Sequence, residues 1–376
     1  MYLKKTIRPW STKACLHTDN RMKGLDKVGV ILSTARQYRQ GQKPAKMILL
    51  ILLWSLPYSL LGQDPNFAQF YTAPAFINPA FAGTTPHFRL TTLYRNQWPS
   101  IPGAYETNLF SFDYNWDYYN SGLAVLLSNN RVKEWGFQAN SAALVYSYQA
   151  RLSDDWVLRL GLKGGYVLRS YNFDQLTFAD QFASGGPTAE NFENVRQGYV
   201  DIGAGALLYS QNFWLGLSLD HITEPNLAFT GNGDIVQEFL PVQLSFHTGY
   251  KASWERGGEV AGYVQPIAAA YWQAGYSRAD VGVNFALLPF VAGVWYRNIS
   301  MPTNTFEGMP STATVLAGLK EGHVSLTYSY DVGGGGLQGQ TGGAHEISLT
   351  ISPPGDYRYK GGEKWQLRGV ECPVQF

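Results

Sequence analysis

Residues 156–171 read Trp156-Val-Leu-Arg-Leu-Gly-Leu-Lys-Gly-Gly-Tyr-Val-Leu-Arg-Ser-Tyr171. Leucine stands at positions 158, 160 and 162, and the residues between and after these leucines are Arg159, Gly161 and Lys163. In a β-strand, successive side chains point to opposite faces, so an apolar residue at every second position forms one apolar face. The stretch therefore predicts a β-strand with one apolar face and one face that carries charge and glycine.

The same alternation recurs along the chain, for example in Phe213–Asp220 and His323–Tyr330. Clusters such as Gly231-Asn-Gly-Asp234 separate the alternating stretches and suit hairpin turns. We predict no helix, and strands near 87–96, 104–115, 121–129, 136–151, 155–172, 198–210, 213–221, 241–253, 258–268, 271–277, 280–287, 290–298, 312–320, 322–331 and 344–352. Single-chain bacterial outer-membrane barrels have even strand numbers, so we expect 14 strands.

Alternation by itself fits either a secreted all-β protein or a membrane barrel. Only 15% of the 376 residues are charged, against about 25% in ordinary soluble domains. Aromatic residues, which settle at the membrane interface, stand close to strand ends at Tyr94, Trp98, Tyr114, Trp116, Trp135, Trp156, Tyr171, Trp254, Tyr271, Trp272 and Tyr296. We therefore predict a single antiparallel transmembrane β-barrel in the outer membrane, over residues 87–352.

The first 62 residues have the layout of an export signal. A basic stretch is followed by the apolar run 47–61, which is too short to span about 30 Å of hydrocarbon as a helix. We expect 47–62 to be a signal peptide cleaved after Gly62. The alternatives are an anchored helix or a long basic n-region, and Met47 is a candidate start, with 1–46 an upstream segment.

Removing this leader takes away 11 positive and two negative charges, so the formal net charge falls from +1 to −8. An acidic exported chain of this kind does not predict a nucleic-acid surface. Only Cys372 remains of the two cysteines, so we expect no internal disulfide.

No motif in the exported chain predicts catalysis, cofactor binding or metal binding. The histidines form no zinc-binding pattern, and Gly231-Asn-Gly-Asp234 has one carboxylate, too few for Ca²⁺. A barrel hydrolase would need a serine such as Ser325 or Ser329 beside His345, which only the proximity of two strands suggests. We therefore predict no catalytic, cofactor-binding or metal-binding residues.

The long loops, the N-terminal segment and the C-terminal tail lie outside the predicted strands. Four long loops, 173–197, 222–240, 299–311 and 333–343, are expected on the outer side of the membrane. Pro74 and Asn78-Pro79 prevent strand pairing, so residues 63–86 are expected to form an irregular plug or periplasmic stretch. Its aromatic residues are Phe67, Phe70, Tyr71, Phe76 and Phe81. The tail 353–376, with Lys360, Lys364, Trp365 and Arg368, is expected in the periplasm, either solvated or touching a partner.

Three motifs resemble one family. Residues 63–85 read Gln63-Asp-Pro-Asn-Phe-Ala-Gln-Phe-Tyr-Thr-Ala-Pro-Ala-Phe-Ile-Asn-Pro-Ala-Phe-Ala-Gly-Thr-Thr85, which is similar to the start of mature PorP/SprF proteins. Tyr94-Arg-Asn-Gln-Trp98 resembles the family's YRxQW segment. Tyr330-Asp331 with Gly343-Ala-His-Glu-Ile-Ser-Leu349 resembles its YDxxxSxLxxxxxGxHEISL ending, although Gly335 or Gly336 stands where the family has serine. Cys372-Pro373 is similar to its short tail.

The resemblance implies a non-enzymatic outer-membrane barrel of type IX secretion and gliding motility. It implies that the barrel assists export or surface anchoring of a client protein or adhesin. The partners it implies are a periplasmic peptidoglycan-binding lipoprotein or components of the secretion ring, besides outer-membrane lipid. The alternative is an outer-membrane channel or transporter for small solutes.

Overall fold

The computed structural model describes residues 66–101, 103–176, 179–186, 195–228, 238–257, 259–301, 311–333, 340–353 and 372–373. The upstream segment 1–46, the signal peptide 47–62 and most of the tail predicted from the sequence lie outside these residues. Within these ranges, no helix has the length and apolar character needed to cross a membrane.

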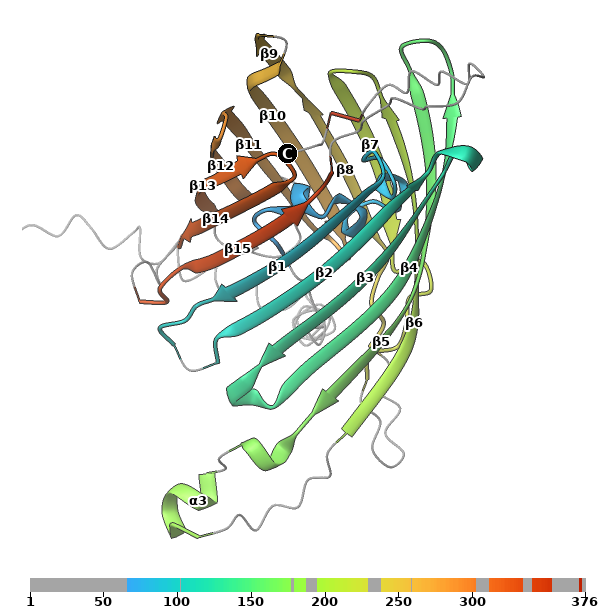
Figure 1. Ribbon diagram of the computed structural model, residues 1–376. Helices are drawn as coiled ribbons and strands as arrows, with labels where there is room; N and C mark the ends of the chain where they lie inside the picture. Colours follow the sequence, from blue (N-terminus) through green and yellow to red (C-terminus); the bar gives the residue numbers. More distant parts are fainter. Residues whose placement is uncertain are drawn as a thin grey trace, which may run out of the picture. The chain divides into compact units, whose positions relative to one another are not determined.

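The described strands form one antiparallel sheet that closes on itself (Figure 1). They are β1 (Phe88–Gln97), β2 (Tyr105–Trp116), β3 (Ser121–Val132), β4 (Phe137–Arg151), β5 (Val157–Tyr171), β6 (Val195–Tyr209), β7 (Phe213–Asp220), β8 (Gln243–Tyr250), β9 (Ala252–Arg256), β10 (Glu259–Gln273), β11 (Tyr276–Leu287), β12 (Phe290–Ser300), β13 (Thr312–Glu321), β14 (Val324–Val332) and β15 (Ala344–Ile351). Each pairs with its neighbours, and β15 pairs with β1.

The barrel has 14 strands because β8 and β9 are two halves of one strand. Both halves pair with β10, and only Lys251 separates them. The antiparallel 14-strand barrel predicted from the sequence is thus confirmed.

The sequence prediction placed one strand too many between residues 258 and 287. The structure has two long strands there, β10 and β11, joined by a two-residue turn at Ala274 and Gly275. Both turn residues have positive φ, 47° and 77°, as a tight hairpin turn with strand-matching twist requires. The prediction was wrong because it placed this turn inside a strand, 271–277.

Among the residues that the structure describes, helical structure is short. The prediction of no helix was wrong for one six-residue helix, α3 (Ala179–Ser184), in the connection between β5 and β6. The remaining helical pieces are 3₁₀ turns: η1 (Phe70–Thr72), η2 (Pro74–Phe76), η3 (Pro79–Phe81), η4 (Asp117–Tyr119), η5 (Lys133–Trp135) and η6 (Phe173–Gln175).

The alternation of β5 becomes an outer and an inner face of the barrel. Leu162 has 61% of its surface exposed on the outside, whereas Arg159 has 1% exposed and points inward. Because lipid has no hydrogen-bonding groups, an apolar outer face and a polar inner face are what a membrane barrel requires.

Aromatic side chains lie on the outer face at both ends of the strands. Trp98 and Tyr296 are exposed near one end, and Trp116 and Trp254 near the other. This arrangement matches the two interface girdles of outer-membrane barrels. Tyr271 was assigned to these girdles incorrectly. It is 8% exposed and belongs to the inner cluster of buried residues.

The two ends of the barrel differ in their connections. The four longest connections follow β5, β7, β12 and β14, and they all lie at one end, which we call the loop end. At the opposite turn end, the strands are joined by five residues or fewer. Strand β1 begins at the turn end and β15 finishes there, so both ends of the barrel sheet lie on this side.

Residues 66–86 lie inside the barrel and contact its inner wall (Figure 1, blue). The segment folds as η1, η2 and η3 because proline occupies the first position of both η2 and η3, where a missing backbone N–H costs nothing. The Asn78 side chain accepts a hydrogen bond from the Ala80 backbone N–H and so caps η3.

Candidate functional site

The N-terminal segment meets the inner wall at one buried carboxylate. Glu346 on β15 accepts hydrogen bonds from the backbone N–H groups of Ala68 and Gln69, each at 2.7 Å. The Gln69 side chain is fully buried; its amide donates to the Ser329 hydroxyl at 3.1 Å and accepts from the hydroxyls of Thr327 and Ser348. The segment is therefore held by charged and neutral hydrogen bonds from two adjacent strands.

Glu346 is the first member of a chain of buried ion pairs. Arg95 bridges Glu346 at 3.1 Å and Asp331 at 2.6 Å. Arg297 then contacts Asp331 at 3.4 Å and Asp280 at 3.8 Å. Buried charges are costly unless they are paired and hydrogen-bonded, and removing one member leaves its partner uncompensated. Arg297 also donates to the Phe67 carbonyl at 2.7 Å, which connects this chain to the segment.

Asn78 anchors the middle of the segment. Its side-chain amide donates to the backbone carbonyls of Ala206 at 3.1 Å and Leu217 at 3.0 Å, and it lies 2.9 Å from the His247 ring nitrogen Nε2. Asn78 is fully buried. An asparagine here both caps η3 and fixes the segment to strands β6 and β7.

Glycines in the wall make room for this part of the segment. A Cβ atom on Gly161 would lie 2.3 Å from the Ala80 backbone nitrogen, and one on Gly205 would lie 2.0 Å from Asn78 Oδ1. Gly122 is the third such position, with the Ala82 carbonyl oxygen 2.0 Å from the added atom. The segment approaches the wall so closely that these three positions accept only glycine without movement.

The end of the segment is fixed at the turn end of the barrel. Arg159 donates to the Ala82 carbonyl oxygen and to the Ser147 hydroxyl, both at 2.7 Å. The Asp113 carboxylate accepts from the Gly83 backbone N–H at 3.2 Å and forms a buried ion pair with Arg89 at 2.8 Å. The polar inner wall thus pairs with the backbone of the segment along its whole described length.

Aromatic stacking completes the inner packing. Trp295 on β12 stacks on Tyr71 with ring centroids 5.3 Å apart and meets Phe70 edge-on at 5.2 Å. Burial, with the nearby Glu346 carboxylate, raises the pKa of Tyr71 well above its ordinary value, so the phenol stays neutral. Cys372 is buried in the same cluster, and the Pro373 carbonyl accepts from the Gln265 side chain at 2.8 Å.

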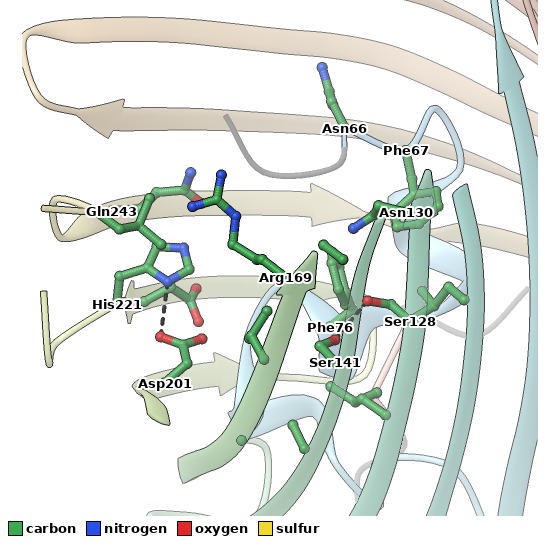
Figure 2. Close-up of a pocket in the computed structure, with 18 of the residues that line it drawn as sticks. Asn66, Phe67, Phe76, Ser128, Asn130, Ser141, Arg169, Asp201, His221 and Gln243 are labelled. Carbon is green, nitrogen blue, oxygen red and sulfur yellow. Dashed lines mark hydrogen bonds and ion pairs between the residues drawn. The ribbon is translucent and has the colours of Figure 1, made fainter. Parts of the chain in front are cut away.

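A cavity of about 460 Å³ lies between the segment and the loop end (Figure 2). Phe67, Phe70 and Phe76 of the segment line its inner side, and residues of the barrel strands and their connections line most of the rest. On one wall, Lys163 forms an ion pair with Asp220, and His221 Nδ1 lies 2.9 Å from the Asp201 carboxylate. Among the described residues, therefore, the segment fills the middle of the lumen and a cavity lies between it and the loop end.

The structure does not assemble the hydrolase pair considered from the sequence. Ser325 and Ser329 are buried and face inward. His345 faces outward, where its Nδ1 lies 2.7 Å from the Tyr328 hydroxyl. Within the described ranges no cluster of three or more histidine, cysteine or acidic side chains has the geometry of a metal site.

Sequence reasoning missed Glu346, Asn78 and Arg95 as the residues that hold the segment. Their signal was present in the motifs: each lies in one of the three stretches that resemble a known family. Glu346 follows the outward-facing His345, so alternation places it on the inner face, but its partner Gln69 lies 277 positions away.

A model of one protein family matches residues 59–351, and its description is type IX secretion system membrane protein PorP/SprF. The chain belongs to the PorP/SprF family. The match covers most of the chain, including the buried segment and every strand of the barrel. A secretion-system membrane protein with this closed barrel is an outer-membrane protein, as predicted.

Solved structures similar to this PorP/SprF barrel are also outer-membrane proteins. Omp33 of Acinetobacter baumannii is 7% identical with a TM-score of 0.40, over 72% of this chain and 99% of that chain. The monoaromatic hydrocarbon channel CymD is 10% identical with a TM-score of 0.41, over 78% and 95%. A Pseudomonas aeruginosa FadL homologue is 12% identical with a TM-score of 0.39, over 78% and 95%. TM-scores this low carry no functional inference. A search of curated proteins found no match.

Proposed function

We propose that this PorP/SprF protein is a non-enzymatic barrel of the type IX secretion and gliding machinery, assisting the export or surface anchoring of a client protein. Family membership supports the link to the secretion machinery. The single observation that supports a role other than solute passage is the packing of residues 66–86 across the lumen, through Glu346, Asn78 and Arg159.

The two ends of the barrel suit different partners. Outer-membrane barrels have long loops outside and short turns in the periplasm, so a client or adhesin would meet the loop end. A periplasmic peptidoglycan-binding lipoprotein or components of the secretion ring would meet the turn end, where β15 finishes and the tail 353–376 begins.

A channel for small solutes is the competing function. It requires a continuous water-filled path, whereas the cavity of about 460 Å³ ends at Phe67, Phe70 and Phe76. The purified protein in a planar bilayer distinguishes the two functions: our proposal expects no stable conductance, and a steady open state would favour the channel.

Gene deletion tests the secretion role directly. A deletion strain should lose surface display of one or more type IX clients, and wild-type protein supplied in trans should restore it. An outer-membrane protein that is not a type IX client serves as the control and should be displayed normally. Undiminished display of every type IX client in the deletion strain would overturn the proposal.

A further inference from the structure

Strand β6 extends past the end of its neighbour β7 at the loop end. All 15 residues of β6 pair with β5, whereas β7 pairs only with residues 204–209. Residues 195–203 therefore have β5 on one side and, within the described chain, no strand on the other (Figure 1). Closure of a barrel ordinarily leaves no strand edge unpaired, so this half of β6 is a break in the ladder.

The even-numbered residues of β6 point their backbone groups toward this break. The Val200 carbonyl accepts from the hydroxyl of Thr223, which follows β7, at 3.0 Å. Backbone groups of successive residues point to opposite sides of a strand, so Gly198 and Arg196 direct their N–H and C=O groups to the same side as Val200. Among the described residues, nothing pairs with these groups or with the Val200 N–H.

The chain that follows β7 does not complete the ladder. The Ile222 backbone N–H donates to the Ile202 carbonyl at 2.9 Å. Further along, the contact goes through a side chain, since the Gln197 amide donates to the Asn226 carbonyl at 2.6 Å. Leu227 then lines the cavity, so the chain enters the lumen there and leaves the edge of β6 on the outside.

This half of β6 lies beyond the hydrocarbon of the membrane. Arg131, Gln138, Ser170 and Arg196 are directly paired across β3, β4, β5 and β6, and all four face outward. Lipid-facing positions of a barrel are apolar, so a row of polar outward side chains marks the part that stands in water. The edge is therefore accessible to a polypeptide on the loop side of the barrel.

The side chains along the edge define the strand that fits it. Gly198 is exposed and has no side chain, and the Tyr166 hydroxyl of β5 covers it, 1.8 Å from where a Cβ would lie. Arg196 is exposed and, within the described residues, has no ion-pair partner. Opposite charges at directly paired positions stabilise a sheet, so an acidic side chain suits the position facing Arg196.

We propose that the loop-end half of β6 binds a partner polypeptide as an added antiparallel β-strand. The backbone of the added strand would pair with Arg196, Gly198 and Val200, with an acidic residue opposite Arg196 and an apolar one opposite Val200. The inference rests on the proposed function for the identity of the partner alone: an extended strand would be the part of a client that the barrel binds.

Fluorescence anisotropy on the full chain in detergent tests the edge with three labelled pentapeptides. The peptide VTVTE has alternating side chains and places its acidic end opposite Arg196. An analogue that is N-methylated at the third and fifth residues keeps the side chains but lacks two N–H groups that would pair with β6. The peptide VTVTK reverses the charge. We expect saturable binding of VTVTE below about 1 mM, binding of the N-methylated peptide about tenfold weaker, and binding of VTVTK about threefold weaker.

Variants then assign the binding to this edge. Val200→Pro removes the N–H that faces the break, at a kind of position where strands accept proline, and should weaken binding of VTVTE about tenfold. Val200→Ala keeps the N–H and should weaken binding by about threefold or less. Arg131→Gln, three strands away, should leave binding unchanged. If Val200→Pro does not fold, Arg196→Glu takes its place and should bind VTVTK more tightly than VTVTE.

Four results would overturn the proposal. They are an absence of saturable VTVTE binding to the folded wild-type protein, equal affinity for the N-methylated peptide, equal losses in the Val200→Pro and Val200→Ala variants, and an Arg196→Glu variant that still prefers VTVTE. A wild-type dimer in sedimentation that Val200→Pro dissociates would overturn it too, because a second copy would then occupy the edge. None of these results bears on the secretion role, since display of clients is measured separately in the deletion strain.

Discussion

The Glu346 carboxylate on the last strand of the barrel accepts a 2.7 Å hydrogen bond from the backbone N–H of Gln69, which lies 277 positions earlier in the chain. The same carboxylate pairs with Arg95. A peptide segment near the start of the described chain is thus fastened by a charge on its final strand, and this contact should be a main support of the folded state.

Replacing Glu346 by glutamine removes the negative charge and keeps the shape. We expect Glu346→Gln to lower the free energy of unfolding by about 3 kcal/mol, because Arg95 keeps one carboxylate partner instead of two. Urea unfolding followed by tryptophan fluorescence measures the change. Glu106→Gln is the matched control, since its pair with the half-exposed Arg131 should contribute less than about 1 kcal/mol. Equal effects of the two variants would contradict the prediction.

Two glycines of the same strand should respond differently to a methyl group. Gly161→Ala places Cβ 2.3 Å from the Ala80 nitrogen, whereas a Cβ on Gly164 has no atom within 4 Å. We expect Gly161→Ala to destabilise the protein by about 1–3 kcal/mol through overpacking. Gly164→Ala should change stability by less than about 1 kcal/mol. The comparison uses the same unfolding assay, and a harmless Gly161→Ala would mean that the segment does not approach β5 this closely.

Asn78 should tolerate no substitution that removes its donor. Asn78→Asp keeps the shape but turns an oxygen toward the carbonyls of Ala206 and Leu217, which accept from the amide at present. We expect a loss of about 2–4 kcal/mol in unfolding free energy. Asn129→Asp, which changes a partly exposed pair with Asn140, is the control and should lower the free energy of unfolding by less than about 1 kcal/mol. A larger loss for Asn129→Asp than for Asn78→Asp would contradict the prediction.

Removing the segment should open the barrel. A variant lacking residues 66–86 loses the contacts of Gln69, Asn78 and Ala82 with the wall, so its lumen should admit water and ions. We expect stable conductance in a planar bilayer from this variant. A variant that lacks Ala179–Gly186, in the connection between β5 and β6, keeps the segment and should stay closed. Silence of a correctly folded variant without 66–86 would show that other residues block the lumen.

The strands were predictable because each depends on a pattern within about ten residues. Leu158, Leu160 and Leu162 face lipid and Arg159 faces the lumen, as a period of two requires. The turn at Ala274 and Gly275 was missed because alanine with positive φ has no distinctive sequence signal.

The site was not predictable in the same way because its contacts are long-range. The pattern around Glu346 shows which face it occupies but not which group lies opposite. The glycines at 122, 161 and 205 were not recognised as contact positions, since nothing local shows that Ala82, Ala80 and Asn78 approach them. The contact of Glu346 with Gln69 and the contacts of these glycines with the segment exist only once the sheet has closed into a barrel.

The fastening of Gln69 to β14 and β15 has a consequence for biogenesis. The residues that bind Gln69 are Thr327, Ser329, Glu346 and Ser348. They lie on β14 and β15, so this binding site forms only after the last two strands of the barrel have paired. A chain that stops folding before that stage would leave residues 66–86 unbound and accessible to proteases. Binding of residues 66–86 to the inner wall therefore marks the completion of barrel assembly.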